Sequence, residues 1–458
     1  MTGRLLVATT LGITVVAAAD SPPPLARLRL ILSTTAKTVA VTVDGATLAS
    51  YRPSVVNPDD VHATHTGRTL QMSNSHAGQS AEATFELVLA DVPSSAAVTW
   101  HVDADTSAQT RLEVYALADF ARPVLVDRFD SAAKAAQFTT RTDSLRLRAS
   151  VNLPAIAPLV LAHYYPWYTL ETWRDPKMAD QPLRLYSTDE TADVSREIAQ
   201  ALSAGIDVFV SSWREWPAEV ADPSDRSMRV LLDAARPTRM KVCIYTESFT
   251  ANAALDWSTA EPATMEKWIA DIVDRYGADP AYLRVDGRPV IFVYAATLIQ
   301  LDDWTALIAR LRASGRNPLL VGDFFESRLI EAFDGQYRYS TVGLVAPDLL
   351  DVYQHQSLRA RTFGLLQPAD RRRIWVAPVT PGSDDTLLSE RDTHQVIDRA
   401  GGRLYDLQWS TAIETGADWV IVTSWNEWWE NTEIEPSRRY GTAYLDATRT
   451  WASLFKRN

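Results

Sequence analysis

The sequence predicts an α/β protein in which a (β/α)8 TIM barrel is preceded by an N-terminal β-sandwich. The chain has 458 residues, roughly three times the usual length of one domain. Residues 156–458 alternate apolar strand-like runs with segments of helical periodicity, whereas residues 25–155 contain only short alternating runs. The hydrophobic share of 46% and the charged share of 22% are typical of globular proteins and exclude disorder as the main state.

The first segment has the features of a secretory signal peptide. Arg4 precedes a mostly apolar run over residues 5–19, which ends in three alanines before Asp20. A short apolar run behind one positive charge and before small residues is typical of such signals. We therefore expect residues 1–19 to be a signal peptide and the protein to be secreted or in the cell envelope. The alternative is a first β-strand, because Thr9, Thr10 and Thr14 lower the hydrophobicity of this run.

Residues 25–155 are expected to form an accessory β-sandwich. Turn-forming pairs such as Asp44-Gly45, Asn57-Pro58 and Pro93-Ser94 separate short runs with a period of two residues, and strands at this spacing favour a sandwich. The predicted strands are Arg27–Leu32, Thr38–Val43, Ala83–Leu89, Ala97–Val102, Arg111–Ala116 and Ser144–Ala149.

Residues 156–458 are expected to form the barrel and to carry the catalytic site. Helical periodicity over residues 191–204, 264–276 and 302–314 separates strand-like runs. A doubly wound open sheet is the competing architecture, but the eight runs and the lack of a glycine-rich first turn favour a barrel. The predicted strands are Leu159–Tyr165, Asp207–Trp213, Lys241–Glu247, Pro289–Ala295, Leu319–Phe324, Thr341–Ala346, Ile374–Val379 and Trp419–Trp425.

Charge and composition exclude several classes of function. The 57 acidic residues outnumber the 45 basic ones, which argues against a nucleic-acid partner because phosphates need a basic surface. The one cysteine, Cys243, excludes an internal disulfide and a thiolate metal cluster. His62 and His65 lack flanking ligands, so we expect no metal or cofactor. No run beyond the first segment approaches the ~20 apolar residues that span a bilayer.

Aromatic and acidic residues follow the predicted strands, at the end of a barrel where active sites lie. His163 and Tyr164 lie at the end of the first strand, where an aromatic segment begins, and Asp323 lies at the end of the fifth. For His163, a core histidine is at least as good an interpretation as a site residue. A cleft lined by carboxylates and by some of the 15 tryptophans suits a neutral oligo- or polysaccharide, because rings cover sugar faces. Asp384-Asp385 is another candidate binding loop, although a plain turn is the simpler interpretation.

The segment after the eighth strand carries the strongest local signal. Glu427 and Glu430 are three residues apart, and glycoside hydrolysis commonly needs two carboxyl groups. A solvated acidic loop is the alternative, but Trp425, Trp428 and Trp429 interleave with the glutamates, and a solvated loop would not need three large rings.

These motifs resemble the family 99 and family 99-like glycoside hydrolases, which include endo-α-mannosidases. The resemblance covers about residues 158–456 and rests on four segments. In related barrels the last segment reads Asn-Glu-Trp-His-Glu-Gly-Thr-Gln-Ile-Glu, so Trp429, Asn431 and Glu433 are departures here, while both glutamates are kept. The four segments are Tyr164-Tyr165-Pro166-Trp167-Tyr168, the strand end at Trp213, Tyr245-Thr246-Glu247, and Trp425 to Glu435.

The resemblance implies a retaining, endo-acting hydrolase of α-linked glycans, with mannose-type glycans as the candidate substrates. It assigns Glu430 as general acid and then base, and Glu427 as the group that deprotonates the substrate 2-hydroxyl. Core packing is an equally good interpretation of Trp167, Tyr168 and Trp213, because strand-end rings also cap barrels. The implied substrate-binding residues are Tyr164, Tyr165, Trp167, Tyr168, Trp213, Glu247, Tyr294, Asn426, Trp428, Trp429 and Glu435.

Three other functions remain open at this point. One is a catalytically inactive carbohydrate-binding envelope protein, although neither glutamate is missing. Another is an α-glucanase-like barrel hydrolase, because the aromatic first motif is also found in α-1,3-glucanase barrels. The third is a glycosyltransferase, although the sequence lacks a diphosphate-binding loop. The sugar, the linkage and the oligomeric state do not follow from the sequence.

Overall fold

The computed structural model describes most of the chain. It covers residues 26–45, 47–55, 60–76, 78–90, 97–116, 124–141, 156–215, 223–251, 257–325, 328–341, 373–389, 391 and 393–457, with a few positions between 349 and 360. Residues 1–19, the predicted signal peptide, lie outside this part. Among the described residues, no helix combines the length and the apolar character needed to cross a membrane.

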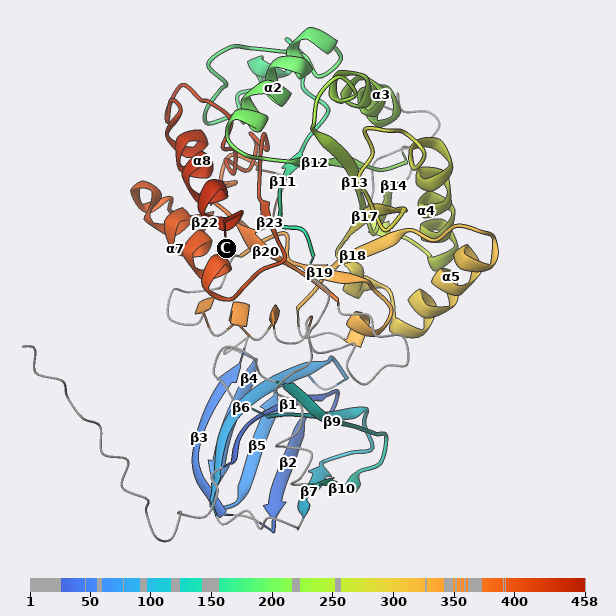
Figure 1. The fold of residues 1–458 in the computed structure, drawn as a ribbon, viewed down its shortest axis with the longest axis vertical. Coiled ribbons are helices and arrows are strands. Elements are labelled where there is room, and N and C mark those ends of the chain that lie inside the picture. The colour runs from blue at the N-terminus through green and yellow to red at the C-terminus, as the bar shows by residue number, and fades with distance from the viewer. Residues whose placement is uncertain are drawn as a thin grey trace, which may run out of the picture.

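Two five-stranded antiparallel sheets form the N-terminal part (Figure 1). They share one apolar core, in which Leu30 and Phe85 of the first sheet meet Val41 and Trp100 of the second. This packing fits the predicted β-sandwich. The first sheet has the order β3-β6-β1-β8-β9 and the second β10-β7-β2-β5-β4. The strands are β1 (Ala26–Thr34), β2 (Thr38–Asp44), β3 (Thr47–Val55), β4 (Val61–Thr66), β5 (Thr69–Asn74), β6 (Ala81–Ala90), β7 (Ala97–Ala104), β8 (Thr110–Ala116), β9 (Val124–Ser131) and β10 (Ala135–Arg141).

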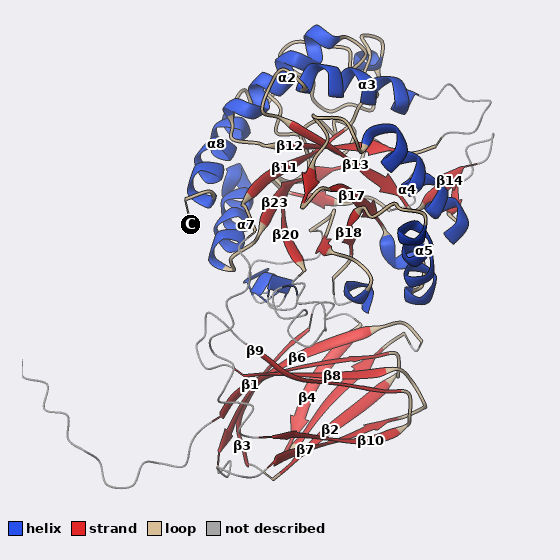
Figure 2. Ribbon diagram, turned by 45° about the vertical axis from the view of Figure 1, so that its right-hand side comes forward, coloured by secondary structure: helices blue, strands red, loops and turns tan. Residues whose placement is uncertain are grey.

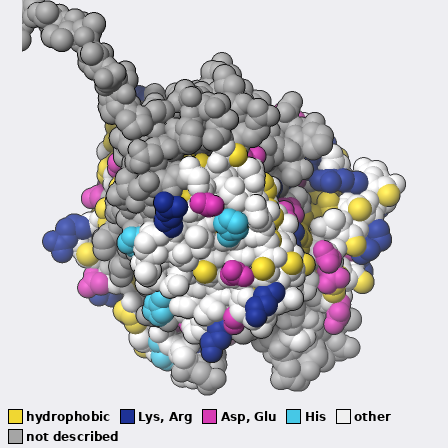
Figure 3. Space-filling model, turned by 90° about the horizontal axis from the view of Figure 1, so that it is seen from below, with side chains coloured by type: hydrophobic (Ala, Val, Ile, Leu, Met, Phe, Trp, Pro, Cys, Tyr) yellow, Lys and Arg dark blue, Asp and Glu magenta, His cyan; other side chains and the backbone are white. Residues whose placement is uncertain are grey.

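The two sheets of the sandwich differ in what covers their outer faces. The first sheet buries polar side chains there, including Ser33, Arg111 and Glu113. Arg111 pairs with Asp130 of β9 at 2.8 Å and with Glu331 of the barrel at 2.5 Å. By contrast, the described side chains on the underside of the molecule in Figure 3 include scattered charges of both signs and several histidines, and they form no large apolar area. The first sheet is therefore the one that contacts the barrel.

Eight parallel strands close into a barrel within the described residues, as predicted. Each strand pairs with the next, β13 pairs with β17, and β11 pairs with β23 to complete the ring. Apart from the short β19, these strands are mainly apolar and buried, as expected for strands covered on both faces. The strands are β11 (Leu159–Tyr164), β12 (Val208–Trp213), β13 (Lys241–Glu247), β17 (Arg288–Tyr294), β18 (Leu319–Asp323), β19 (Gly335–Tyr337), β20 (Ile374–Val379) and β23 (Trp419–Val422).

Helices surround the barrel (Figure 2) because each buries one apolar face against the strands. In α4, Met265, Trp268, Ile269 and Ile272 are buried at spacings of three and four residues, and Pro262 begins the helix. The helices are α2 (Thr191–Ser203), α3 (Pro223–Ala235), α4 (Pro262–Tyr276), α5 (Leu301–Ala313), α7 (Arg403–Glu414) and α8 (Ala443–Phe455). Shorter elements are η1 (Thr172–Arg174), β14 (Phe249–Ala251), β15 (Trp257–Thr259), β16 (Arg284–Val285), η2 (Ala296–Leu298), η3 (Arg328–Glu331), β21 (Ser383–Asp384), β22 (Val396–Ile397) and η5 (Ala400–Gly402).

The predicted position of the sixth barrel strand is wrong. The apolar run after Thr341 attracted the prediction, but β19 at Gly335–Tyr337 pairs with β18 and β20 in that place. This strand has three residues and contains a glutamine, so it offers no apolar run to detect. Residues 342–346, and the last predicted sandwich strand at 144–149, lie outside the described part of the chain.

Candidate active site

The aromatic lining of the barrel begins with a neutral histidine. His163 of β11 is fully buried, and its ring lies 5.1 Å from the rings of both Tyr245 and Tyr339. Burial lowers the pKa of His163 to about 3, so the imidazole carries no charge at neutral pH. His163 is thus a core residue beneath the site, one of the two interpretations that the sequence left open.

The turn after β23 is anchored to the first strand of the barrel. The Trp425 amide donates to the His163 carbonyl at 2.8 Å. The Asn426 side chain accepts from the Tyr165 amide at 2.7 Å and donates to the Tyr165 carbonyl at 3.0 Å. The Glu427 amide donates to Ser424 Oγ at 2.7 Å. These bonds fix the backbone that carries Glu427 and Glu430.

Glu430 reaches the cleft, where two side chains form hydrogen bonds to its carboxyl group. The Tyr339 hydroxyl donates to Glu430 Oε2 at 3.0 Å, and the hydroxyls of Tyr165 and Tyr339 are 2.6 Å apart. On the other oxygen, Arg391 Nη2 forms an ion pair at 2.7 Å. Arg391 also pairs with Asp385 at 2.6 Å. Glu430 therefore receives one neutral and one charged hydrogen bond.

Glu427 lies deeper than Glu430. Its exposed fraction is 5%, whereas the Glu430 side chain is 22% exposed. Burial, together with the charge of Glu430, raises the pKa of Glu427 well above its usual range. Burial also raises the pKa of Glu247, which Arg214 contacts at 3.3 Å. The protonated forms of Glu427 and Glu247 are thus favoured by burial.

An open cavity of about 650 Å³ lies over Glu430. Tyr294, Asp323 and Tyr339 line it from the barrel strands and the segments after them, while Asp385 and Arg391 line it from the loop after β20. Burial raises the pKa of Asp323, whose carboxylate accepts from the amides of Ala295 and Tyr339 at 3.2 Å each. The cavity has the size of a small-molecule site and is more polar than apolar, as a sugar site requires.

Aromatic rings form a wall beside the carboxyl pair. The ring of Trp167 lies 4.8 Å from that of Tyr165 and 6.3 Å from that of Trp429. Trp429 also packs at 5.3 Å from Tyr168, and its Nε1 donates to Asp175 at 3.1 Å. Trp167 and Trp429 are half-buried and Tyr168 is fully buried. The two tryptophans are thus the rings able to touch a sugar, and Tyr168 supports them.

Several predicted binding residues lie behind this wall. Tyr164 points away from the cleft and donates to Glu197 of α2 at 3.1 Å. Glu435 accepts from Tyr186 at 2.9 Å, and burial followed by the charge of Glu197 raises its pKa well above the usual range. Trp428 is fully buried, and so is Asn426. Trp213, at the end of β12, is 3% exposed. These side chains support the site from within the fold.

An arginine clamp, made of Arg399 with Asn431 and Glu433, holds the turn after Glu430. Arg399 donates to the Asn431 carbonyl at 2.8 Å, to the Glu433 carbonyl at 3.1 Å and to Glu433 Oε1 at 2.8 Å. Asn431 has a φ of 51° and donates to the Asp384 carbonyl at 2.7 Å. Asn tolerates this left-handed conformation better than most residues, so it can stand where related barrels have glycine.

The sequence analysis did not identify Tyr339, Arg391 or Arg399. Tyr339 follows β19, so the misplaced sixth strand hid it. Arg391 and Arg399 belong to a loop without regular periodicity, where the sequence shows no pattern that separates a site arginine from a surface one. Among the described residues, no group of three or more His, Cys, Asp or Glu side chains is arranged to hold a metal ion.

Comparison with known proteins bears on this geometry directly. The model of glycosyl hydrolase family 99 matches residues 180–456. A glycoprotein endo-alpha-1,2-mannosidase of Rattus norvegicus is 27% identical over 360 residues, which are 65% of this chain and 74% of the relative. A mannosidase-like protein of Danio rerio is 25% identical over 307 residues, covering 59% of this chain and 65% of the relative.

A solved structure shares the fold and part of the sequence. The family 99 endo-alpha-mannosidase of Bacteroides thetaiotaomicron is 25% identical, with a TM-score of 0.54, and the match covers 65% of this chain and 97% of that one. The family match extends over more than half of the chain and includes the turn with both glutamates. The protein described here therefore belongs to glycosyl hydrolase family 99 and is a glycoside hydrolase.

Proposed function

We propose that the protein hydrolyses α-mannosidic linkages within neutral glycans, with retention of configuration and with Glu427 and Glu430 as the catalytic pair. The observation that carries the proposal is the paired placement of the two carboxyl groups. Glu430 reaches the cavity between Tyr339 and Arg391, and Glu427 lies buried three residues before it. The mannose preference rests on the relatives, which are endo-alpha-mannosidases.

The reaction needs one carboxyl group protonated and one ionised. Glu427 takes the proton of the substrate 2-hydroxyl, and the 2-oxygen forms a bond to the anomeric carbon as the bond to the leaving oxygen breaks. Glu430 gives its proton to that leaving oxygen. Water then attacks the anomeric carbon, and the bond from this carbon to the 2-oxygen breaks, while Glu430 accepts the proton of the water and Glu427 returns a proton to the 2-oxygen. Two inversions at one carbon give net retention.

Glu427 is the deeper of the two carboxyl groups, and burial together with the charge of Glu430 raises its pKa and favours its protonated form. The proposed role of Glu427 needs its ionised form, so Glu427 must lose its proton when the substrate binds. The Tyr339 hydroxyl donates to Glu430 at 3.0 Å, and the Tyr165 hydroxyl lies 2.6 Å from that of Tyr339, so this chain of hydroxyl groups helps to position Glu430.

Two substitutions test the roles. Glu430→Gln should lower kcat on a mannan by about 10²–10⁴-fold, and the loss should be smaller on a mannosyl substrate with a good aryl leaving group. Glu427→Gln should lose as much on both substrates, since its task does not depend on the leaving group. Glu414→Gln, the same change at an exposed position of α7, is the control. Equal activity of all four proteins on a verified substrate would place the reaction elsewhere.

Export remains part of the proposal. We infer that the mature chain begins near Asp20, because the apolar run behind Arg4 ends in three alanines. N-terminal sequencing of protein from the culture medium or envelope fraction decides this point. An intact Met1 on all of the active protein would contradict it.

A further inference from the structure

A second cavity lies beside the catalytic one. It has a volume of about 640 Å³, close to that of the cavity over Glu430. Ser383 and Ile397 line both cavities, and these two residues pair across the hairpin of β21 and β22. We call this second space the hairpin pocket; the hairpin, the start of α7 and the start of α8 enclose it.

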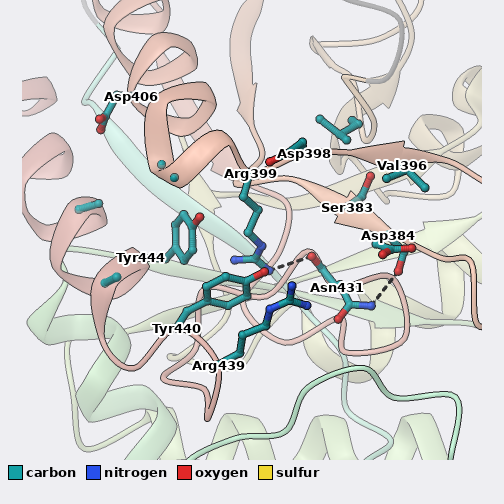
Figure 4. Close-up of a pocket in the computed structure, with 15 residues that line it drawn as sticks. Ser383, Asp384, Val396, Asp398, Arg399, Asp406, Asn431, Arg439, Tyr440 and Tyr444 are labelled. Atoms are coloured by element: carbon teal, nitrogen blue, oxygen red, sulfur yellow. Dashed lines mark hydrogen bonds between the residues drawn. The ribbon is translucent and has the colours of Figure 1, made fainter.

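The hairpin pocket is built on the catalytic turn itself. The Asp384 amide donates to the Glu430 carbonyl at 2.8 Å, and Asn431 donates to the Asp384 carbonyl at 2.7 Å. Figure 4 shows Asn431 at this cavity with Arg399 and Arg439 drawn beside it. A ligand in the pocket would thus lie one residue along the chain from the general acid.

The lining suits a neutral ligand with many hydroxyl groups. Ser383 Oγ is buried and has no hydrogen-bond partner in the described part of the chain. The exposed Arg439 guanidinium lies 5.4 Å from the Tyr440 ring, and the described residues give it no ion pair. Asp384, Asp398 and Asp406 supply acceptors, so two arginines and three aspartates line one space. This mixture offers donors and acceptors without favouring an anion or a cation.

The backbone beside the pocket is also accessible. Gly401 and Gly402 line it with φ angles of 63° and 94°, and a Cβ at either position would meet no atom within 4 Å. A ligand can therefore approach their main-chain groups closely. Pockets of about 300–1,000 Å³ are the usual size for small-molecule ligands, so the space admits more than a single water-sized group.

We propose that the hairpin pocket is a further saccharide subsite, which binds a neutral hexose unit of the same glycan that is cleaved at Glu430. The inference rests on the proposed function and names its substrate class: a glycan long or branched enough to reach across the hairpin. Binding energy from such a remote unit acts on kcat/KM, because interactions far from the reacting carbon help to hold it in place.

The experiment compares a short and a long substrate. The wild type and its variants are assayed on an aryl mannoside and on a series of longer linear and branched α-manno-oligosaccharides. The measured quantity is the ratio of kcat/KM on the long substrate to that on the short one. Ala443→Trp fills the pocket from α8, and Arg439→Ala removes an exposed donor without disturbing the core. Ala313→Trp, at an exposed position of α5, is the matched control.

We expect Ala443→Trp to lower the ratio by about tenfold and Arg439→Ala by at least about threefold, the size of one lost hydrogen bond. Ala313→Trp should leave the ratio as in the wild type. If the wild type cleaves both substrates and neither pocket variant changes the ratio, the hairpin pocket is not a subsite, although the proposed function stands. If the wild type cleaves no α-mannoside in the series, the proposed function and the subsite fail together.

Discussion

Replacing Arg399 by Met should destabilise the barrel and loosen the turn that carries Glu430. The Arg399 side chain is 8% exposed and its partner Glu433 is fully buried, so solvent screens the pair little. Met removes all three hydrogen bonds of the clamp and leaves Glu433 without a counter-charge. Breaking a buried pair from one side costs about 3–5 kcal/mol, which is a large part of the stability of a typical domain.

The sign of the pH dependence makes the prediction sharper. Burial raises the pKa of Glu433 to about 7, above its ordinary value of 4.5, although Arg399 opposes this rise. A carboxyl group whose pKa is higher in the folded than in the unfolded chain stabilises the fold below its unfolded-state pKa. This stabilisation is lost as the pH rises through its folded-state pKa. Without Arg399 the pKa of Glu433 rises further, so the destabilisation should be larger at pH 8 than at pH 5.

Chemical unfolding of the barrel at both pH values measures the change. Arg403→Met, at an exposed position at the start of α7, is the control. Arg399→Met with Glu433→Gln should recover part of the loss, because the second change removes the unpaired carboxylate. A loss of free energy of unfolding below about 1 kcal/mol at pH 8, or an equal loss at both pH values, would refute this account of the clamp.

Three further outcomes follow from the same contacts. Arg391→Gln should lower kcat/KM, because it removes the cation that holds Glu430 at 2.7 Å; a partly exposed pair of ~0.2–1 kcal/mol corresponds to a loss of at most about fivefold, and an unchanged kcat/KM would contradict a role of this pair in the site. Asn431→Ala should cost about 1–2 kcal/mol because Ala disfavours positive φ, whereas Asn431→Gly should cost less, as paired thermal melts will show. A chain that starts near residue 155 should keep turnover on small substrates but melt earlier, since Glu331 loses Arg111; loss of turnover in a folded protein would place residues 25–155 in the cleft.

Most of the barrel strands could be predicted from the sequence because they are continuous apolar runs. Seven of the eight predicted strands match, and the exception, β19, is a three-residue strand stabilised by its neighbours rather than by its own composition. In the sandwich, the sequence analysis missed β3, β4, β5, β9 and β10. In β4 and β5, polar residues such as His62 and Gln71 fill the outer positions and weaken the strand pattern. Short strands take their conformation from pairing partners, which a local pattern does not reveal.

The residues of the candidate site also fall into those that a local sequence pattern can identify and those that depend on packing. Glu427, Glu430 and the tryptophans are recognisable because their motif is contiguous in sequence. Whether a ring faces the cleft or the core depends on packing, so the sequence could not separate Trp167, half-buried beside Trp429, from Trp428, which is fully buried. Arg391 reaches Glu430 across 39 residues of chain. Such a contact exists only after the loop has folded back.

The seam between the first and last barrel strands has a consequence for how the enzyme is made. The Asn426 side chain forms two hydrogen bonds with the backbone of Tyr165, a residue 261 positions earlier. At about 5–20 residues per second, ribosomes need roughly 13–50 s to make the chain between them. During that interval the aromatic segment exists without Glu427 and Glu430. With the roles proposed above for these two glutamates, a nascent or truncated chain that stops short of them cannot cut glycans.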